Sequence, residues 1–216
     1  MAKSISTINR LRAEAAALFV LAPGLQVVFF DTLGVFAPIA AVCVVAAYLL
    51  HRTPDWRWRE LVDPRGLTGW LPALAGFTVV AVLAIAGLVL VLRPDDFLIL
   101  PRERTGLWIA IMTFYPFLSV IGQELVFRPL FFRRYGQLFA RDSHALLANA
   151  AAFAFAHVFY QNWVALLLTF TGGLAFGYAY QRSGSFPLIF LMHAVAGQAI
   201  FTFGLGSYFY HGAIPT

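Results

Sequence analysis

Apolar residues run along this chain in long stretches, separated by short polar segments. A helix of about 20 apolar residues crosses the hydrocarbon core of a bilayer, and seven stretches meet or approach that length. The pattern therefore predicts an all-α polytopic membrane protein, with about seven transmembrane helices in a bundle and a single integral-membrane domain over residues 1–216. The predicted helices cover residues 11–30, 33–50, 69–92, 106–134, 144–159, 163–180 and 186–205.

The composition supports membrane insertion and leaves little room for a soluble second domain. Hydrophobic residues make up 61% of the chain and charged residues 12%, whereas a soluble domain carries about 25% charged residues. The net charge of +5 does not indicate nucleic-acid binding, because the basic residues lie in short segments between the spans. The N-terminal segment shows no short apolar core followed by a cleavage site, so no removable signal peptide is predicted.

The distribution of basic residues predicts the orientation of the bundle. With the N-terminus on the inner side, eleven Lys and Arg residues fall in inner segments and three in outer segments, while Arg128 remains within the membrane. This is the bias of the positive-inside rule. We therefore expect a cytoplasmic N-terminus and an external C-terminus, in a protein of bacterial inner-membrane type.

Three polar side chains interrupt the fourth predicted span. Glu124 and Arg128 are four residues apart, so they share a helix face and can pair as carboxylate and guanidinium. Gln123 precedes them in the chain. Ionisable groups at membrane depth cost about 2.5–3.5 kcal/mol each on insertion scales, so they usually serve a purpose there. The purpose here is either a structural ion pair between helices or part of a reaction site.

Two histidines also fall inside predicted spans. At a rise of about 1.5 Å per helical residue, Gln123 lies roughly 15 Å from the basic pair at 133–134, His157 roughly 20 Å from the start of its span, and His193 roughly 12 Å from the turn at 183–185. We therefore expect all three at similar depth. A lone histidine in a helix interior is more often a hydrogen-bonded packing residue than a catalyst. A carboxylate and two imidazoles that meet in a buried, partly wet cavity provide what general-base activation of water requires. The sequence therefore predicts an intramembrane polar cavity.

The same residue types also suit a metal. Two histidines and a carboxylate can hold zinc with one position open for water. The sequence has no His-x-x-x-His on one helix face, so zinc is the weaker interpretation, and no metal or other cofactor is expected. Gly173 and Gly177 form a G-x-x-x-G pattern, which predicts close packing of the sixth span against a neighbour.

With these residues in hand, residues 117–201 resemble the CPBP family of intramembrane proteases. This family includes the type II CAAX prenyl endopeptidases and the bacteriocin-processing, or Abi, proteins. Three motifs occur in the family's order. Gln123-Glu124-Leu-Val-Phe-Arg128 matches Glu-Glu-x-x-x-Arg, Phe153 to His157 matches Phe-x-x-x-His, and His193 begins His-x-x-x-Asn with Gly197 at the asparagine position.

The resemblance implies a glutamic-type intramembrane endopeptidase that needs no metal, with a family-like catalytic core over about residues 106–206. In that family the first glutamate, here Gln123, and the second-motif histidine, here His157, activate the attacking water. His193 and the residue at position 197 stabilise the oxyanion, and Glu124 and Arg128 support the other groups. Because Gly197 has no side chain, the neighbouring Gln198 is considered as a replacement donor. The remaining residue assigned to substrate or oxyanion support is Phe153.

Gln123 is the main departure from the family pattern. An amide cannot accept the proton of water at neutral pH, although glutamine fills nearly the same space as glutamate. Three interpretations follow. Gln123 is an engineered substitution that traps a protease, which we favour; or it is natural and the chain is a substrate-binding pseudoprotease; or Glu124 acts as the base, although the next helical residue points about 100° away.

We therefore expect an intramembrane endopeptidase that cleaves membrane-tethered or lipidated protein tails, in an inactive Glu-to-Gln form. Its expected partners are the lipid bilayer and a membrane-anchored protein or peptide, such as a prenylated CAAX-like tail, a bacteriocin leader or a sorting segment of an exported protein. The main rival is a catalytically silent binding or scaffold protein on the same fold. A transporter with a proton relay is a weaker rival, because no internal repeat is found.

Overall fold

The computed structural model describes residues 5–34 and 36–209, and within these ranges the chain is helical with no strand. Five helices in this part of the chain are long and apolar enough to cross a membrane: Ile5–Val28, Leu71–Leu92, Thr105–Leu138, Trp163–Ser183 and Phe186–Phe203. The structure is thus that of an integral membrane protein. Two predicted spans, residues 33–50 and 144–159, are also helical but shorter, at 16 residues in α4 and 14 residues in α10.

The elements follow one another with few residues between them. In chain order they are α1 (Ile5–Ala16), η1 (Ala17–Leu21), α2 (Ala22–Val28), α3 (Phe30–Leu33), α4 (Phe36–His51), η2 (Trp58–Leu61), α5 (Arg65–Thr68), α6 (Leu71–Leu92), η3 (Pro94–Asp96), α7 (Ile99–Glu103), α8 (Thr105–Tyr115), η4 (Pro116–Val120), α9 (Ile121–Leu125), η5 (Val126–Tyr135), η6 (Gly136–Leu138), α10 (Asp142–Phe155), η7 (Val158–Tyr160), α11 (Trp163–Ser183), α12 (Phe186–Phe203) and η8 (Leu205–Phe209).

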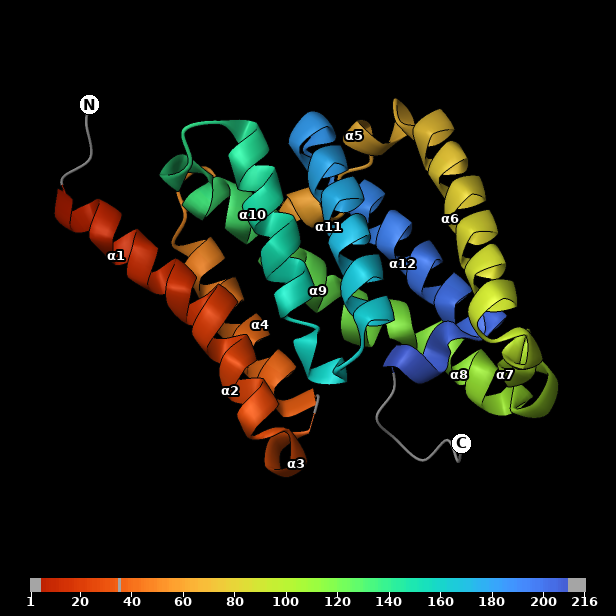
Figure 1. The fold of residues 1–216 in the computed structure, drawn as a ribbon. Helices are drawn as coiled ribbons and strands as arrows, with labels where there is room; N and C mark the ends of the chain where they lie inside the picture. The colour runs from red at the N-terminus through yellow and green to blue at the C-terminus, as the bar shows by residue number, and fades with distance from the viewer. Residues whose placement is uncertain (1–4, 35, 210–216) are drawn as a thin grey trace.

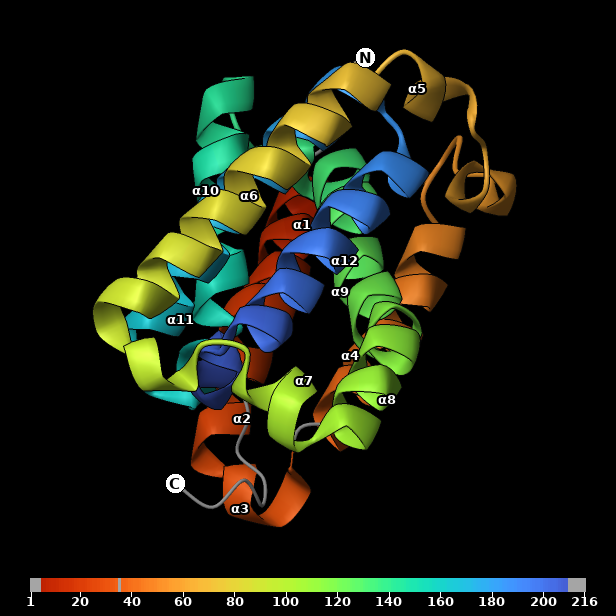
Figure 2. The ribbon, with the colours of Figure 1, turned by 90° about the vertical axis from the view of Figure 1, so that its right-hand side faces the viewer.

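The chain passes repeatedly between the two ends of the bundle (Figure 1). The start of α1, the short helix α5 and the start of α10 lie at the upper end in this view, whereas α3, α7 and the end of α12 lie at the lower end. Seen from the side, α12 lies between α6 and the α8–α9 helix (Figure 2). The segments that the charge count assigns to opposite sides of the membrane therefore gather at opposite ends of the bundle.

The long helix that carries the polar stretch is not a uniform α-helix. It continues from α8 to η6, and two of its segments, η4 and η5, are π-helical. Each contains a proline, Pro116 or Pro129, which lacks the N–H that an α-helix interior would use. The wider turn accommodates the prolines, and π-helical turns are common at functional sites. Gln123 and Glu124 lie in α9, between the two π-helical segments.

Small residues bring α10 and α11 into close contact. A side chain at Gly173 would meet the Cα atom of Ala150 at 2.9 Å, and one at Gly177 would meet the Leu146 side chain at 2.7 Å. Only glycine allows the two backbones to approach this closely. The packing role predicted for Gly173 and Gly177 is confirmed, and it matters for the site because α10 carries residues that hold Arg128.

Ion pairs tie the upper end of the bundle together. Arg133 pairs with Glu60 and also lies over the Trp56 ring, with 5.2 Å from the guanidinium carbon to the ring centroid. Arg134 pairs with Glu14 of α1 at 2.8 Å. Charged and tryptophan side chains are typical of the headgroup region of a membrane. This end of the bundle therefore fits a membrane surface. It carries Arg133 and Arg134, from which the depth of Gln123 was predicted.

Candidate functional site

The centre of the bundle holds a fully buried ion pair. Glu124 and Arg128 have no exposed side-chain surface, and Glu124 Oε2 lies 3.0 Å from Arg128 Nε, as the four-residue spacing predicts. The guanidinium also donates to Asn149 Oδ1 of α10 and lies over the rings of Phe153 and Phe176, at 5.1 and 5.7 Å. An ion pair without access to solvent requires such additional partners, because its desolvation is costly.

Asn149 connects this ion pair to the backbone of the long helix. It is fully buried, and its Nδ2 donates to the Phe127 carbonyl oxygen at 2.6 Å. Arg128 Nη1 donates to the same carbonyl at 3.3 Å, so Asn149 and Arg128 both contact the backbone of η5 at Phe127. Asn149 was not predicted from the sequence, although a lone asparagine within an alanine-rich span was an available signal.

His193 of α12 joins the other oxygen of Glu124. Its Nδ1 lies 2.7 Å from Glu124 Oε1, and its Nε2 lies 3.2 Å from the Tyr115 hydroxyl of α8. An ionised carboxylate only accepts, so Nδ1–H donates to Glu124 and the Nε2 lone pair accepts from Tyr115. Both ring nitrogens are therefore engaged, and Arg128, Glu124, His193 and Tyr115 form one continuous chain of polar contacts.

His157 lies just after the end of α10, not inside a helix as predicted. The backbone N–H of His157 donates to the Ala154 carbonyl, and His157 Nδ1 lies 2.7 Å from the Phe153 carbonyl oxygen. The last carbonyl groups of a helix need donors from outside its regular pattern. Here the imidazole itself supplies one, which fixes the proton on Nδ1 and leaves the Nε2 lone pair free.

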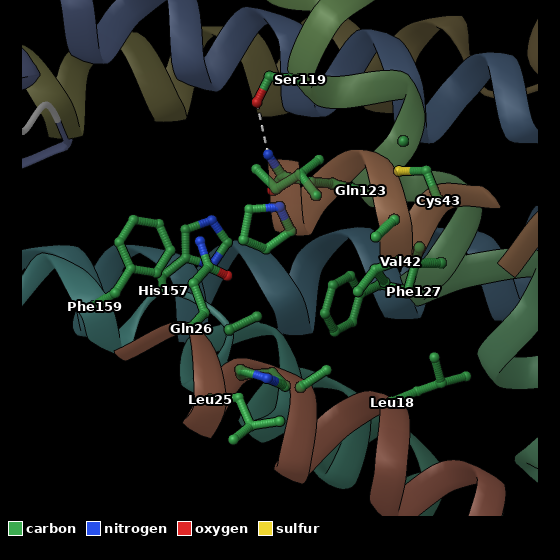
Figure 3. A pocket seen from close by; sticks show the side chains of 18 of the residues that line it. Leu18, Leu25, Gln26, Val42, Cys43, Ser119, Gln123, Phe127, His157 and Phe159 are labelled. Atoms are coloured by element: carbon green, nitrogen blue, oxygen red, sulfur yellow. Dashed lines mark hydrogen bonds between the residues drawn. The ribbon is translucent and has the colours of Figure 1, made fainter. Parts of the chain in front are cut away.

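Gln123 faces a different direction from Glu124. Its Nε2 donates to Ser119 Oγ at 2.7 Å, one helical turn earlier (Figure 3). Among the described residues, no group donates to the buried Gln123 Oε1 atom. The amide oxygen is therefore available to a donor that enters the neighbouring space.

Two cavities meet at this position. The first, of about 280 Å³, lies between the N-terminal helices and the long helix, and the second, of about 230 Å³, lies among α6, α11 and α12. Tyr115, Phe153 and His193 line the second cavity only. Glu124 and Arg128 line neither. The four residues that line both are Ser119, Gln123, His157 and Tyr160.

The first cavity contains a polar group that the sequence did not reveal. Gln26 of α2 is 8% exposed, and its Nε2 has no hydrogen-bond partner within the described residues. Its side chain lines this cavity, as do those of Gln123 and His157 (Figure 3). Gln26 was not predicted because it is a single amide within the first apolar span and belongs to none of the sequence motifs.

The structure separates the three residues assigned to substrate or oxyanion support. Phe153 is 2% exposed and lies between Arg128 and His157. Gly197 lies against Tyr115, so closely that a side-chain carbon at Gly197 would meet the tyrosine hydroxyl at 2.3 Å. Gln198 points elsewhere: its Nε2 donates to the Met112 carbonyl at 2.9 Å, and it is not among the residues that line either cavity.

Metal binding was the competing prediction for these residues. Within residues 5–34 and 36–209, no three His, Cys, Asp or Glu side chains come close enough to hold a metal ion. Glu124 and His193 meet, but both are occupied by Arg128 and Tyr115. The expectation of a site without a metal stays a prediction.

The fold and the site together define a helical integral membrane protein with a buried polar centre beside two cavities. Residues 103–197 match the family model described as type II CAAX prenyl endopeptidase Rce1-like, so this part of the chain is a domain of that family. The matched stretch holds the five residues predicted as catalytic, from Gln123 to His193, and ends one residue before Gln198. Membership implies an intramembrane protease of the glutamic type that acts on proteins with C-terminal motifs. No curated protein and no solved structure matches the chain.

Proposed function

We propose that the protein is an intramembrane endopeptidase whose reaction site is the wall between the two cavities, and that Gln123 makes the chain catalytically silent. One observation carries this proposal. Gln123 and His157 line both cavities, whereas Glu124 lines neither and has both oxygens engaged. The position next to bound substrate is therefore 123, and Glu124 is a structural residue, not a replacement base.

The chemistry of the site depends on the residue at position 123. A carboxylate there would accept a proton from a water molecule, while His157 Nε2 would hold the same water by its lone pair. Ser119 Oγ, which now accepts from the amide, would instead donate its hydroxyl proton to the carboxylate and orient it. The amide of Gln123 holds water equally well but does not take its proton, so binding is retained while hydrolysis is lost.

We propose that the substrate is a membrane-tethered or lipidated protein tail in an extended conformation. Such a tail would pass from one cavity to the other, which brings one peptide bond to Gln123 and His157. Because the cavities lie within the bundle, the tail would enter from the bilayer between helices. We propose further that α4 and α10 complete a seven-pass bundle in a bacterial inner membrane, with the N-terminus cytoplasmic, as the basic residues indicate.

A silent binding protein on the same fold remains the second candidate. The observation that favours it is the hydrogen bond from Gln123 Nε2 to Ser119 Oγ, since a carboxylate would not donate there and the site accommodates the amide well. This candidate predicts that a glutamate at position 123 brings no cleavage. The two candidates share the cavities and the substrate, and they differ only in the outcome of that substitution.

The role of His157 gives the test of the site itself. In the Gln123→Glu form, His157→Ala is expected to lower the rate of cleavage of a lipid-anchored peptide in proteoliposomes by about 10²–10⁴-fold, because a positioned acid–base group contributes that much. His144→Ala is the matched control, since His144 is exposed at the start of α10 and distant from the cavities. An unchanged rate in His157→Ala would contradict the assignment of the reaction site to the wall between the two cavities.

A further inference from the structure

Tyr115 is a half-buried tyrosine that neither the sequence motifs nor the proposed mechanism uses. It lies at the end of α8 and comes to His193, 78 positions later in the chain, at 3.2 Å. It also lines the second cavity together with Gln123 and His157. Within the chain of contacts from Arg128 through Glu124 and His193, Tyr115 is therefore the residue that brings a hydroxyl group to the second cavity. Gln123 and His157 line the same cavity.

The space around Tyr115 exists because position 197 is a glycine. A side-chain carbon at Gly197 would lie 2.3 Å from the Tyr115 hydroxyl and 2.5 Å from the ring carbon that carries it. An asparagine at this position, as the family motif has, would overlap the tyrosine. Tyr115 and an asparagine side chain at position 197 would thus occupy the same space beside His193.

His193 has no nitrogen left for a substrate. Its Nδ1 is held by Glu124 and its Nε2 by Tyr115. The ring is also fixed from the side, where it stacks on Phe176 at 5.1 Å between centroids. Because Nε2 carries no proton, His193 cannot donate to a reacting carbonyl, whereas the Tyr115 O–H can rotate about its C–O bond from Nε2 to such an acceptor.

We propose that the Tyr115 hydroxyl replaces the missing asparagine and donates a hydrogen bond to the carbonyl oxygen of the scissile peptide in the second cavity. The inference rests on the proposed function. Water oxygen adds to the carbonyl carbon, the π electron pair moves onto the carbonyl oxygen, and the water proton goes to the carboxylate at position 123. The Tyr115 O–H rotates from His193 Nε2 to the carbonyl oxygen, keeps its proton and stabilises the new negative charge. The ring of Tyr115 is held meanwhile by its edge contacts with His193 and Phe201.

The first experiment uses the Gln123→Glu form in proteoliposomes with a lipid-anchored peptide. Tyr115→Phe is expected to lower kcat by about 10²–10³-fold with little change in KM, the loss typical of one oxyanion donor. Tyr178→Phe is the matched control, because Tyr178 is 52% exposed on the outer side of α11. Retention of kcat within about threefold in Tyr115→Phe would overturn the inference and leave the proposed function standing.

A side-chain exchange separates the hydrogen bond from a packing role. Gly197→Asn alone is expected to be inactive, because the new side chain overlaps Tyr115. Combined with Tyr115→Ala, it is expected to recover kcat to within about tenfold of the parent, since asparagine then has both the space and a donor. A double variant no more active than Tyr115→Ala would contradict the assignment.

A binding measurement decides the inference even if the Gln123→Glu form cleaves nothing, a result that would overturn the proposed function. The probe is a phosphinate analogue of the peptide tail, whose tetrahedral anion resembles the addition intermediate. The unsubstituted chain is expected to bind it about 10- to 100-fold more tightly than Tyr115→Phe does, with equal affinity of both for the matching amide peptide. Equal phosphinate affinities, or no binding by either form, would overturn the inference.

Discussion

Replacing Gln123 with glutamate is expected to convert an inert chain into a peptidase, with a gain of at least about 10²–10⁴-fold in the cleavage rate of a membrane-anchored peptide. The gain is expected because the side chain at position 123 lines both cavities, as does His157. Ser119 also contacts that side chain by a hydrogen bond. The substitution adds one proton acceptor and almost no volume. The measurement is the initial rate in proteoliposomes, followed by mass spectrometry of the products.

Gln137→Glu is the matched control for this substitution. Gln137 is exposed at the end of the same long helix, so the same chemical change there is expected to leave the chain inert. Cleavage by Gln137→Glu at a comparable rate would mean that added charge, and not the placement of a base, causes the gain. Absence of cleavage by Gln123→Glu for all three proposed substrate types would favour the silent binding protein.

Removing the carboxylate of Glu124 is expected to destabilise the protein by about 3–5 kcal/mol, because Glu124→Gln leaves Arg128 as an uncompensated buried charge. Both side chains are fully buried, and Glu124 also accepts the hydrogen bond that orients His193. The measurement is the free energy of unfolding in detergent micelles. The loss is expected in the chain as it stands, without any cleavage, because it concerns structure and not turnover.

Glu14→Gln supplies the comparison for Glu124→Gln. Glu14 also pairs with an arginine, Arg134, but its side chain is 22% exposed at the end of the bundle. Both partners of the Glu14–Arg134 pair keep some contact with solvent, so a smaller loss is expected than for the fully buried pair. Equal losses in the two variants would contradict the structural role of Glu124 and return it to consideration as a base.

Much of the architecture was accessible from the sequence because a membrane imposes simple constraints. The positions of all seven predicted helices follow from the apolar stretches, and the pairing of Glu124 with Arg128 follows from helical spacing. The end of α10 did not follow, since apolar residues such as Val158 and Phe159 continue past Phe155, where the helix ends. His157 lies beyond the end of α10 for this reason, and its ring completes the hydrogen bonding of that helix end.

The rest of the site depends on contacts that no local pattern encodes. Tyr115 and His193 are 78 residues apart, and Arg128 and Asn149 are 21 apart. Gln26 reaches the first cavity from outside the family-matched stretch. Tyrosine and asparagine in apolar helices are common packing residues, so their type alone does not mark a role. Only the packing of α8 and α10 against the other helices identifies Tyr115 as the partner of His193 and Asn149 as the partner of Arg128.

The central claim is that a glutamate at position 123 and His157 together activate water without a metal ion. The most direct test is the initial rate of peptide cleavage by Gln123→Glu in proteoliposomes, with and without prior treatment by a zinc chelator. The account predicts cleavage at the same rate in both samples. A rate that falls on chelation and returns with added zinc would contradict it, and so would a complete absence of cleavage.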